Sequence, residues 1–420
     1  MDMKIPLVLG IAVVAVACAG FLIMNDSGDD SGDFAGREIV PVENFDDGIV
    51  AVGQDSFRWV TYFGLADKCV MVDQNDMTNY LGKSFMYVGR AQVDIEGGDS
   101  AKLSSGDAAR KYFTHTNCGI TTDDVRTILE LKPSIMVVPE AFYNDYRNEM
   151  EQIEAGGINT VAIGYIYTFL ERDGLGITDD LERQIDVLAT AFGMEERGEQ
   201  LKSAFSTLVE DCLSLTSGIT DKRSAYIGSL AYNGAHGIDS SIPYYIPFEL
   251  AGLENILSGK VDYSGSGVKT YKASDIGSNI EDDTILFVDA SGYSQNNTND
   301  AKGILRMFQG KDAYLVAPYI WTGINYDTIF VIAYQMMNQA YGDDVLSDSE
   351  LEDRIDNVYN LFYGTPYSNR NISAINNYIA PLPGENTSIF DDMNSLYLVA
   401  KGNPISGTVS IDSDGNLSYT

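Results

Sequence analysis

The feature that most constrains the fold is a repeated alternation of short apolar runs with helical patterns. The runs SIMVV (134–138) and NTVAI (159–163) each follow a segment whose apolar residues have helical spacing. Asp123 and Asp124 lie where negative charge favours the start of the first helix, and Pro133 marks its end. Repeated strand–helix–strand units imply a parallel sheet flanked by helices, so we predict an α/β fold.

A longer helical stretch separates two such regions. Apolar residues recur at helical spacing over 181–192 and again over 201–212, with Gly193 between them. The second helix, which begins at Glu195 and has about 22 residues, would be roughly 33 Å long. After it the alternation restarts with the runs AYIG, TILFV and AYLV. We therefore predict two similar lobes with parallel sheets, joined by one long interdomain helix.

A chain of 420 residues has room for two cores, and its patterns suggest where they begin and end. The polar stretch NDSGDDSGDFAG reads as a flexible linker, and the C-terminal ISGTVSIDSDGNLSYT suggests a small hairpin. The predicted parts are a membrane anchor or lipoprotein signal (1–24), the linker (25–36), the N-terminal lobe (37–178), a helical connection that includes the interdomain helix (179–218), the C-terminal lobe (219–384) and a C-terminal extension of unknown role (385–420).

The N-terminal run from Ile5 to Met24 contains no charged residue and has about the 20 residues that a helix needs to cross a bilayer. Cys18 follows Ala15, Val16 and Ala17, which resembles a lipoprotein processing site. Three alternatives stay open: an uncleaved anchor, lipidation at Cys18 and a cleaved signal peptide. Each of them places the rest of the chain outside the cytoplasm, and we expect a membrane-anchored protein of the cell surface.

Acidic residues greatly outnumber basic ones, 61 against 27, for a net charge of −34. Because phosphate binding depends on Lys and Arg, we expect no nucleic-acid partner. Four scattered cysteines and two histidines, His115 and His236, do not form a recognisable metal motif, so we expect no resident metal and no cofactor. The phosphate-loop, serine-hydrolase and zinc-protease motifs are also absent, and we do not expect an enzyme.

Several segments carry a family resemblance. A Gly36-Arg37 turn leads to the strand-like GIVAVG and a helix over SFRWVTYFG, and the segment LELKPSIMVV follows later in the chain. These segments resemble, in the same order, ABC-transporter substrate-binding proteins for iron chelates, haem and cobalamin, in which a Leu-Lys-Pro-Asp segment corresponds to LELKPSIMVV. The segments AYIGSLAYNGAHGIDSSIPYYIPFELAGLENI and INYDTIFVIAYQMMNQAYG resemble the archaeal members of the iron-complex group, and LFYGTPYS matches their near-terminal helix end. Together these segments cover about residues 36–382.

This resemblance implies a bilobed fold of the class III periplasmic-binding-protein type, with cargo held between the lobes. The implied cargo is an iron complex such as a siderophore-like chelate, with cobalamin or haem as alternatives, and the implied partners are a membrane-bound ABC permease and its ATPase. Family members dock on the permease through acidic residues of both lobes, which correspond here to Asp123, Asp124 and Glu249. Arg126 stands where the family usually has its first-lobe glutamate.

Ligands of open α/β sheets bind at the loops that follow the carboxyl ends of strands. In such loops Arg can grip carboxylate or hydroxamate oxygens, and Tyr or Trp can pack against the rim of a chelate. Tyr232 and His236 could also coordinate a ferric ion directly. The residues expected in these loops are Asp55, Arg58, Arg90, His115, Tyr232, His236, Tyr293, Tyr319, Trp321, Asn325 and Tyr326.

Two functions of other classes stay open. An enzyme such as a metal chelatase or a hydrolase could use the cleft with His115 or His236 as its base, but no nucleophile and carboxylate are recognisably arranged around either residue. A surface adhesion protein is compatible with the acidity and with five N-glycosylation sequons. These sequons begin at Asn25, Asn296, Asn371, Asn386 and Asn416.

Overall fold

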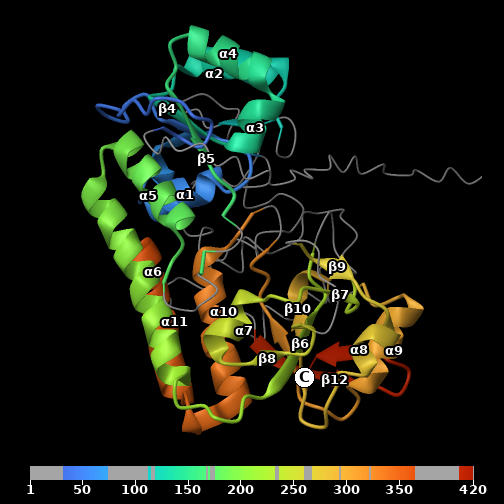
Figure 1. The fold of residues 1–420 in the computed structure, drawn as a ribbon. Coiled ribbons are helices and arrows are strands. Elements are labelled where there is room, and N and C mark those ends of the chain that lie inside the picture. Colours follow the sequence, from blue (N-terminus) through green and yellow to red (C-terminus); the bar gives the residue numbers. More distant parts are fainter. Residues whose placement is uncertain are drawn as a thin grey trace, which may run out of the picture.

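The computed structural model of this protein describes residues 32–73, 112–114, 119–166, 169–170, 176–231, 236–259, 267–292, 295–320, 323–364 and 406–419. Within these ranges the chain forms two α/β lobes, and the long helix α6 (Glu195–Thr216) runs alongside both (Figure 1). In the same ranges, no helix combines the length and the apolar character that crossing a membrane requires. The predicted anchor, including Cys18, lies outside the described residues.

The N-terminal lobe contains a five-stranded parallel sheet with the strand order β3-β2-β1-β4-β5. Its central strands are buried on both faces, as the continuous apolar runs in their sequences indicate. The strands are β1 (Ile49–Ala51), β2 (Cys69–Val72), β3 (Tyr112–Phe113), β4 (Ile135–Pro139) and β5 (Thr160–Ile163). The helices of this lobe are α1 (Ser56–Tyr62), α2 (Thr122–Leu131), α3 (Glu140–Asp145) and α4 (Arg147–Ala155), with the 3-10 turn η1 (Ala66–Lys68) before β2.

The helices between the lobes begin and end where the sequence predicts. Helix α5 (Asp179–Phe192) starts at the N-cap Thr178 and stops at Gly193, whose φ of 64° favours glycine. Helix α6 has 22 residues, and Cys212 on its inner face is fully buried. The predicted interdomain helix is therefore confirmed.

The C-terminal lobe contains a six-stranded sheet with the order β13-β12-β11-β10-β6-β8. Four strands are parallel, whereas β12 and β13 form an antiparallel hairpin beside β11, as the C-terminal sequence suggests. The strands are β6 (Ser224–Gly228), β8 (Glu254–Asn255), β10 (Ile285–Asp289), β11 (Ala313–Val316), β12 (Ser406–Ile411) and β13 (Leu417–Tyr419). A separate two-stranded sheet pairs β7 (Ser240–Ser241) with β9 (Lys269–Thr270).

Five α-helices and two 3-10 turns complete the described part of this lobe. Most residues of helix α10 are buried, and α11 lies against it. These elements are α7 (Ile246–Ala251), α8 (Ala273–Gly277), η4 (Ala290–Gly292), α9 (Asn299–Met307), α10 (Tyr326–Tyr341), η5 (Gly342–Asp344) and α11 (Asp348–Tyr363).

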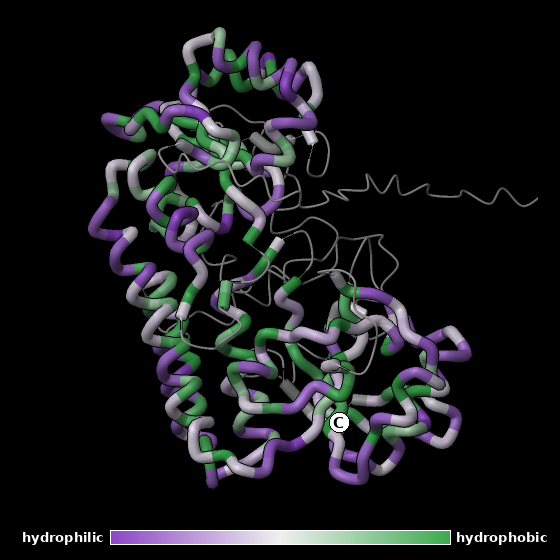
Figure 2. Tube along the Cα trace, viewed as in Figure 1, coloured by the Kyte–Doolittle hydropathy of each residue, from purple (hydrophilic) through white to green (hydrophobic). Residues whose placement is uncertain are grey.

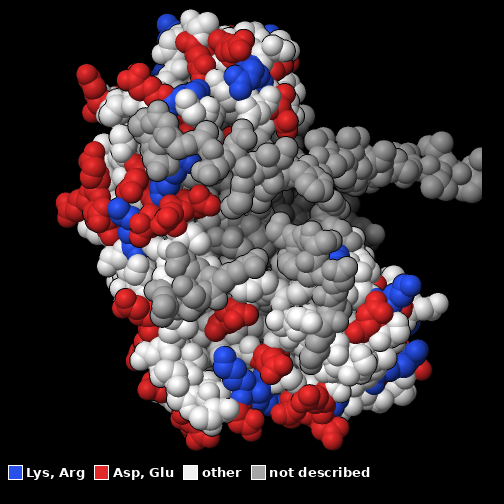
Figure 3. All heavy atoms as spheres, viewed as in Figure 1, with Lys and Arg blue, Asp and Glu red and all other residues white. Residues whose placement is uncertain are grey.

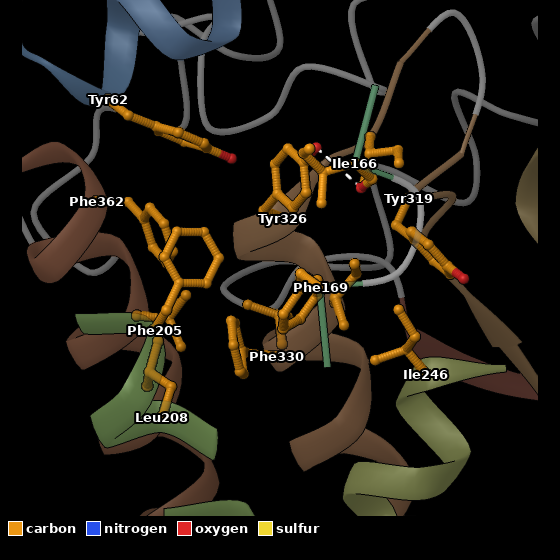
Figure 4. Close-up of a cluster of buried hydrophobic side chains, with 14 of the residues drawn as sticks. Tyr62, Ile166, Phe169, Phe205, Leu208, Ile246, Tyr319, Tyr326, Phe330 and Phe362 are labelled. Atoms are coloured by element: carbon orange, nitrogen blue, oxygen red, sulfur yellow. Dashed lines mark hydrogen bonds between the residues drawn. The ribbon is translucent and has the colours of Figure 1, made fainter. Parts of the chain in front are cut away.

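One apolar core continues from the first lobe through α6 into the second lobe. Figure 2 shows hydrophobic residues concentrated in the strands of each lobe and hydrophilic residues on the outer helices. At the lobe boundary, aromatic rings from four helices pack together. The ring centroids of Phe205 on α6 and Phe362 on α11 are 5.1 Å apart (Figure 4). Those of Trp59 on α1 and Tyr326 on α10 are 5.3 Å apart. Such ring pairs contribute about 0.5–1.5 kcal/mol each beyond their burial. The lobes are therefore packed against each other as well as tethered by one helix.

A segment at the start of the described chain covers the free edge of β5. Phe34 N–H donates to Ala162 O at 3.2 Å, and the buried carboxylate of Asp33 accepts from Ala162 N–H at 2.8 Å. The same carboxylate pairs with Arg37, which also pairs with Glu154 of α4. The Gly36-Arg37 turn thus fixes this segment to the N-terminal lobe.

Candidate functional site

The strand order identifies where each sheet could bind a ligand. In the N-terminal lobe the order reverses between β1 and β4, and in the C-terminal lobe it reverses between β6 and β10. Ligands of open α/β sheets bind at the carboxyl ends of the strands beside such a reversal. The relevant loops therefore begin after Ala51, Pro139, Gly228 and Asp289.

The carboxyl ends of the two sheets face each other. Oδ1 of Asp55, which follows β1, accepts a hydrogen bond from Ile324 N–H, which follows β11, at 2.8 Å. The hydroxyl of Tyr326, at the start of α10, donates to the carbonyl of Ile166, which follows β5, at 3.1 Å. We call this region, formed by residues 52–55, 164–166, 317–320 and 323–325, the interlobe junction.

A buried charge cluster lies at the interlobe junction. Arg58 Nε is 3.6 Å from Asp55 Oδ1, and Arg58 Nη1 is 3.9 Å from Asp327 Oδ1. Burial favours a lower pKa for Arg58, but Tyr62, Asp55 and Asp327 raise it overall, so the guanidinium stays charged. Tyr62 donates to Asp327 Oδ1 at 2.6 Å, and its pKa is well above the ordinary value because it is buried and lies beside that carboxylate.

Five of the predicted cargo residues are buried in this structure. Asp55, Arg58, Asn325, Tyr319 and Tyr326 lie in the expected strand-end regions, but their exposed fractions are only 0–6%. Asp55, Arg58 and Tyr326 contact residues of the opposite lobe, so in this structure these three side chains join the lobes. The cargo role of all five residues stays a prediction. Tyr319 and Asn325 make contacts within the C-terminal lobe: the ring centroids of Tyr319 and Tyr245 are 5.5 Å apart, and Asn325 donates to Pro318 O at 3.3 Å.

His236 is half-buried on the carboxyl edge of the C-terminal sheet, as predicted from its loop. The loops after β6 and β10 are in close contact there, because a Cβ on Gly292 would overlap the carbonyl oxygens of His236 and Ser229. Asn296 reinforces the contact by accepting from Ile238 N–H at 2.7 Å. The backbone at His236 is therefore held by both loops beside the strand-order reversal.

Two residues of the N-terminal carboxyl edge were missed in the sequence analysis. Tyr165 follows β5 and is 41% exposed, yet burial of its surroundings and then the charge of Asp55 raise the pKa of its phenol. Glu140 follows β4 and is exposed, and partial burial raises the pKa of its carboxyl. Both positions come directly after an apolar run, so the strand-end argument that selected the other candidates could have found them.

The remaining predicted cargo residues lie outside the described residues, and their roles stay predictions. They are Arg90, His115, Tyr232, Tyr293 and Trp321. Among the residues that the structure describes, no group of three or more His, Cys, Asp or Glu side chains is arranged to hold a metal ion.

The predicted docking residues differ in their surroundings. Asp123 is exposed and pairs with Arg126 at 2.9 Å, and Glu249 is exposed in the first turn of α7. Asp124 is fully buried, and its carboxylate accepts from the N–H and the hydroxyl of Thr121 in a capping box. The prediction for Asp124 is therefore corrected: it caps α2 and is not available to a partner. Figure 3 shows acidic residues on the surface of both lobes.

Comparison with known proteins gives one family match. The family model described as periplasmic binding protein matches residues 49–305. No curated protein sequence matches the chain.

Solved structures of low sequence identity have a similar fold. A periplasmic solute binding protein from Veillonella parvula DSM 2008 is 17% identical with a TM-score of 0.50, covering 87% of this chain and 98% of that one. The TroA-like periplasmic binding protein FepB from Veillonella parvula is 15% identical with a TM-score of 0.51, covering 80% and 96%. The molybdate-bound MolA of Haemophilus influenzae is 17% identical with a TM-score of 0.52, covering 80% and 98%. At these identities the likeness concerns the fold alone.

Proposed function

Because this chain belongs to the periplasmic binding protein family, whose model matches more than half of its length, we propose that it captures a small metal complex between its lobes and delivers it to an ABC importer. The observation that carries the proposal is that the carboxyl ends of two parallel sheets face one junction. Ligand sites of such sheets lie at these ends, and sites between two lobes can enclose most of a small ligand.

The proposed cargo is an iron complex such as a siderophore-like chelate. The sequence segments that resemble the iron-complex group support this choice. Tyr165 and His236, one on each lobe, are the kinds of side chain that pack against a chelate rim or approach its metal. Cobalamin and haem are the alternatives for the same site.

An oxyanion, such as the molybdate bound by MolA, fits the described part of the site less well. Glu140 is an exposed carboxylic acid on the N-terminal edge. The guanidinium of Arg58 already lies between Asp55 and Asp327, both buried. Repulsion from Asp and Glu side chains would weaken the binding of a small anion.

We place the protein outside the cytoplasm, held at the membrane by residues 1–24 or by a lipid on Cys18. This position would keep it beside the permease and its ATPase. The exposed Asp123 and Glu249, one on each lobe, are the acidic residues proposed to contact the permease.

Calorimetry with purified protein tests the proposal, using a ferric siderophore, haem, cobalamin and molybdate as probes. We expect one metal complex to bind and molybdate not to bind. Mass spectrometry of the protein purified from its native host identifies the natural cargo. Tight binding of molybdate would contradict the proposed cargo. So would the absence of a bound metal complex in the native protein together with no binding of any metal complex by the recombinant protein.

A matched pair of variants tests the location of the site. Tyr165→Ala should weaken binding of the probe by roughly tenfold, because an aromatic contact is lost from an exposed side chain whose removal does not affect the core. Met307→Ala, which truncates another partly exposed apolar side chain on α9, should leave the affinity unchanged. Equal affinities for both variants and the parent would place the site elsewhere.

A further inference from the structure

Asp55 is the N-cap residue of α1, yet its side chain makes no capping hydrogen bond to that helix. Aspartate is favoured at this position because its carboxylate usually accepts from the first backbone N–H groups. Its backbone is also left-handed, with φ 64° and ψ −12°, a conformation that few residues with a Cβ adopt and that Asp adopts more readily than most. The carboxylate accepts instead from Ile324 N–H of the other lobe. Backbone strain of this kind persists where the surrounding contacts require it.

The turn on the other lobe is shaped for the same contact. Ile320 and Ile324 form an antiparallel bridge, and Asn325 N–H donates to Tyr319 O at 2.8 Å. Ile324 N–H lies outside this internal pairing and donates to Asp55. The neighbouring Gly323 permits the approach, since a Cβ there would overlap the carboxylate of Asp55.

The contact is enclosed in the protein. Asp55 and Ile324 are 6% and 0% exposed, and Arg58 provides a positive charge 3.6 Å from the same carboxylate oxygen. Hydrogen bonds to charged groups are stronger than neutral ones, and breaking a buried one leaves both partners without solvation. Separating the lobes at this point is therefore unfavourable.

We propose that Asp55 is a positioning residue: with Gly323 and Ile324 it forms an interlobe clasp that holds the two lobes in one mutual orientation before any cargo binds. The clasp also fixes Gly323 and Ile324 at the carboxyl edge of the C-terminal sheet. The clasp is a property of the cargo-free protein, so the test of the clasp is independent of the test of the proposed function.

The clasp can be broken from either lobe. Asp55→Ala removes the acceptor, and Gly323→Ala places a methyl group where the carboxylate lies. Asp55→Asn keeps an acceptor oxygen for Ile324 N–H. Gly267→Ala, a glycine with open space around it and no positive φ, is the control for a glycine substitution. Circular dichroism first establishes that each variant is folded.

Two measurements on cargo-free protein test the clasp. We expect amide hydrogen exchange at Ile324 to accelerate by roughly tenfold in Asp55→Ala and Gly323→Ala, because one buried hydrogen bond is lost. It should stay close to the parent rate in Asp55→Asn and Gly267→Ala. Small-angle scattering should show a larger radius of gyration for the first two variants only. The double variant Asp55→Ala/Gly323→Ala should resemble each single one, since both break the same contact.

Each other outcome overturns part or all of the proposal. Unchanged exchange in Gly323→Ala shows that the contact is not made in solution. Faster exchange with an unchanged radius of gyration shows that Asp55 orders the turn but does not set the orientation of the lobes. If Asp55→Ala does not fold, Gly323→Ala and Asp55→Asn still give these results.

Discussion

The hydroxyl of Tyr62 donates a 2.6 Å hydrogen bond to Oδ1 of Asp327, although the residues belong to different lobes and are 265 positions apart. Both side chains are buried, and Tyr62 also packs 4.8 Å from Phe362 of α11. Helix α1 follows a strand of the first lobe but contributes side chains to the core of the second. Side chains from the sequence of the first lobe therefore pack within the core of the second lobe.

Removing this hydroxyl should destabilise the protein. Tyr62→Phe keeps the ring but leaves Asp327 with one fewer donor, and we expect a loss of about 1.5–3 kcal/mol in the free energy of unfolding. Urea unfolding measures the loss. In a double-mutant cycle with Asp327→Asn, the two changes should couple by about 0.5–3 kcal/mol. Additive effects would show that the hydrogen bond contributes nothing of its own.

Alkaline pH should unfold the protein cooperatively. Burial raises the pKa values of Tyr62, Tyr226 and Tyr326 well above the ordinary value of 10.0. Above pH 10 the unfolded chain releases these protons while the folded protein keeps them, so the unfolded state binds fewer protons and stability falls as pH rises. Below pH 10 these residues cause no such loss.

Absorbance at 295 nm and circular dichroism, followed together, check this expectation. The buried tyrosines should ionise only as the secondary structure is lost. Ionisation of all tyrosines at their ordinary pKa with the fold intact would mean that the junction is open to solvent.

The elements of the fold could be predicted because local patterns determine them. Helix α6 shows this clearly: Gly193 ends the preceding helix, and the apolar spacing from Leu201 to Cys212 fixes both its length and its buried face. The parallel sheets followed from the repeated strand–helix–strand alternation, and the uninterrupted apolar runs agree with strands that are buried on both faces.

The candidate site was predicted only in part, because burial at the junction depends on contacts between distant segments. Asp55 and Arg58 follow a strand, and the strand-end argument selected them as cargo residues, whereas the structure places them in buried contacts between the lobes. Nothing in the local sequence indicates that a turn from about 270 positions later covers them, since Ile324 and Asp327 reach them through the packing of the whole C-terminal lobe. Tyr165 was missed although its position after β5 follows from the same argument.

A methyl group at Gly292 should disturb the C-terminal side of the site. It would overlap the carbonyl oxygens of His236 and Ser229, so Gly292→Ala should cost about 1–3 kcal/mol and weaken binding of the cargo probe. Gly218→Ala, where nothing lies near the added atom, should change neither quantity. Thermal unfolding measures the stability of the two variants, and calorimetry measures their affinity for the cargo probe. Equal stability and equal affinity in both variants would mean that the loops after β6 and β10 are not in close contact.

The N-terminal segment should contribute to stability from Asp33 onward. Deleting residues 1–31 should leave the free energy of unfolding unchanged within about 0.5 kcal/mol and the protein soluble. Asp33→Ala in that shortened chain should cost about 3 kcal/mol, because it leaves Arg37 without a buried partner and removes the acceptor for Ala162 N–H. Denaturant midpoints give both values. Aggregation of the shortened chain would show that the first residues belong to the fold.

Salt should stabilise this protein, because its net charge of −34 makes the folded state self-repelling. The Debye length falls from about 10 Å at 0.1 M to about 3 Å at 1 M salt, so NaCl should weaken the repulsion and raise the urea midpoint.

Lys202 lies 2.8 Å from Asp186 and 2.6 Å from Glu199, and these two carboxylates raise its pKa.

Lys202→Gln would leave the two carboxylates facing each other, and the rise of the midpoint with NaCl should become steeper. Lys311→Gln removes the same charge from an ammonium group that contacts the backbone carbonyls of Glu281 and Asp282, so its slope should stay nearer to that of the parent. Urea midpoints at several NaCl concentrations give the three slopes. If the parent midpoint falls with NaCl, attraction between opposite charges outweighs the repulsion, and the acidic surface does not limit the stability of the fold.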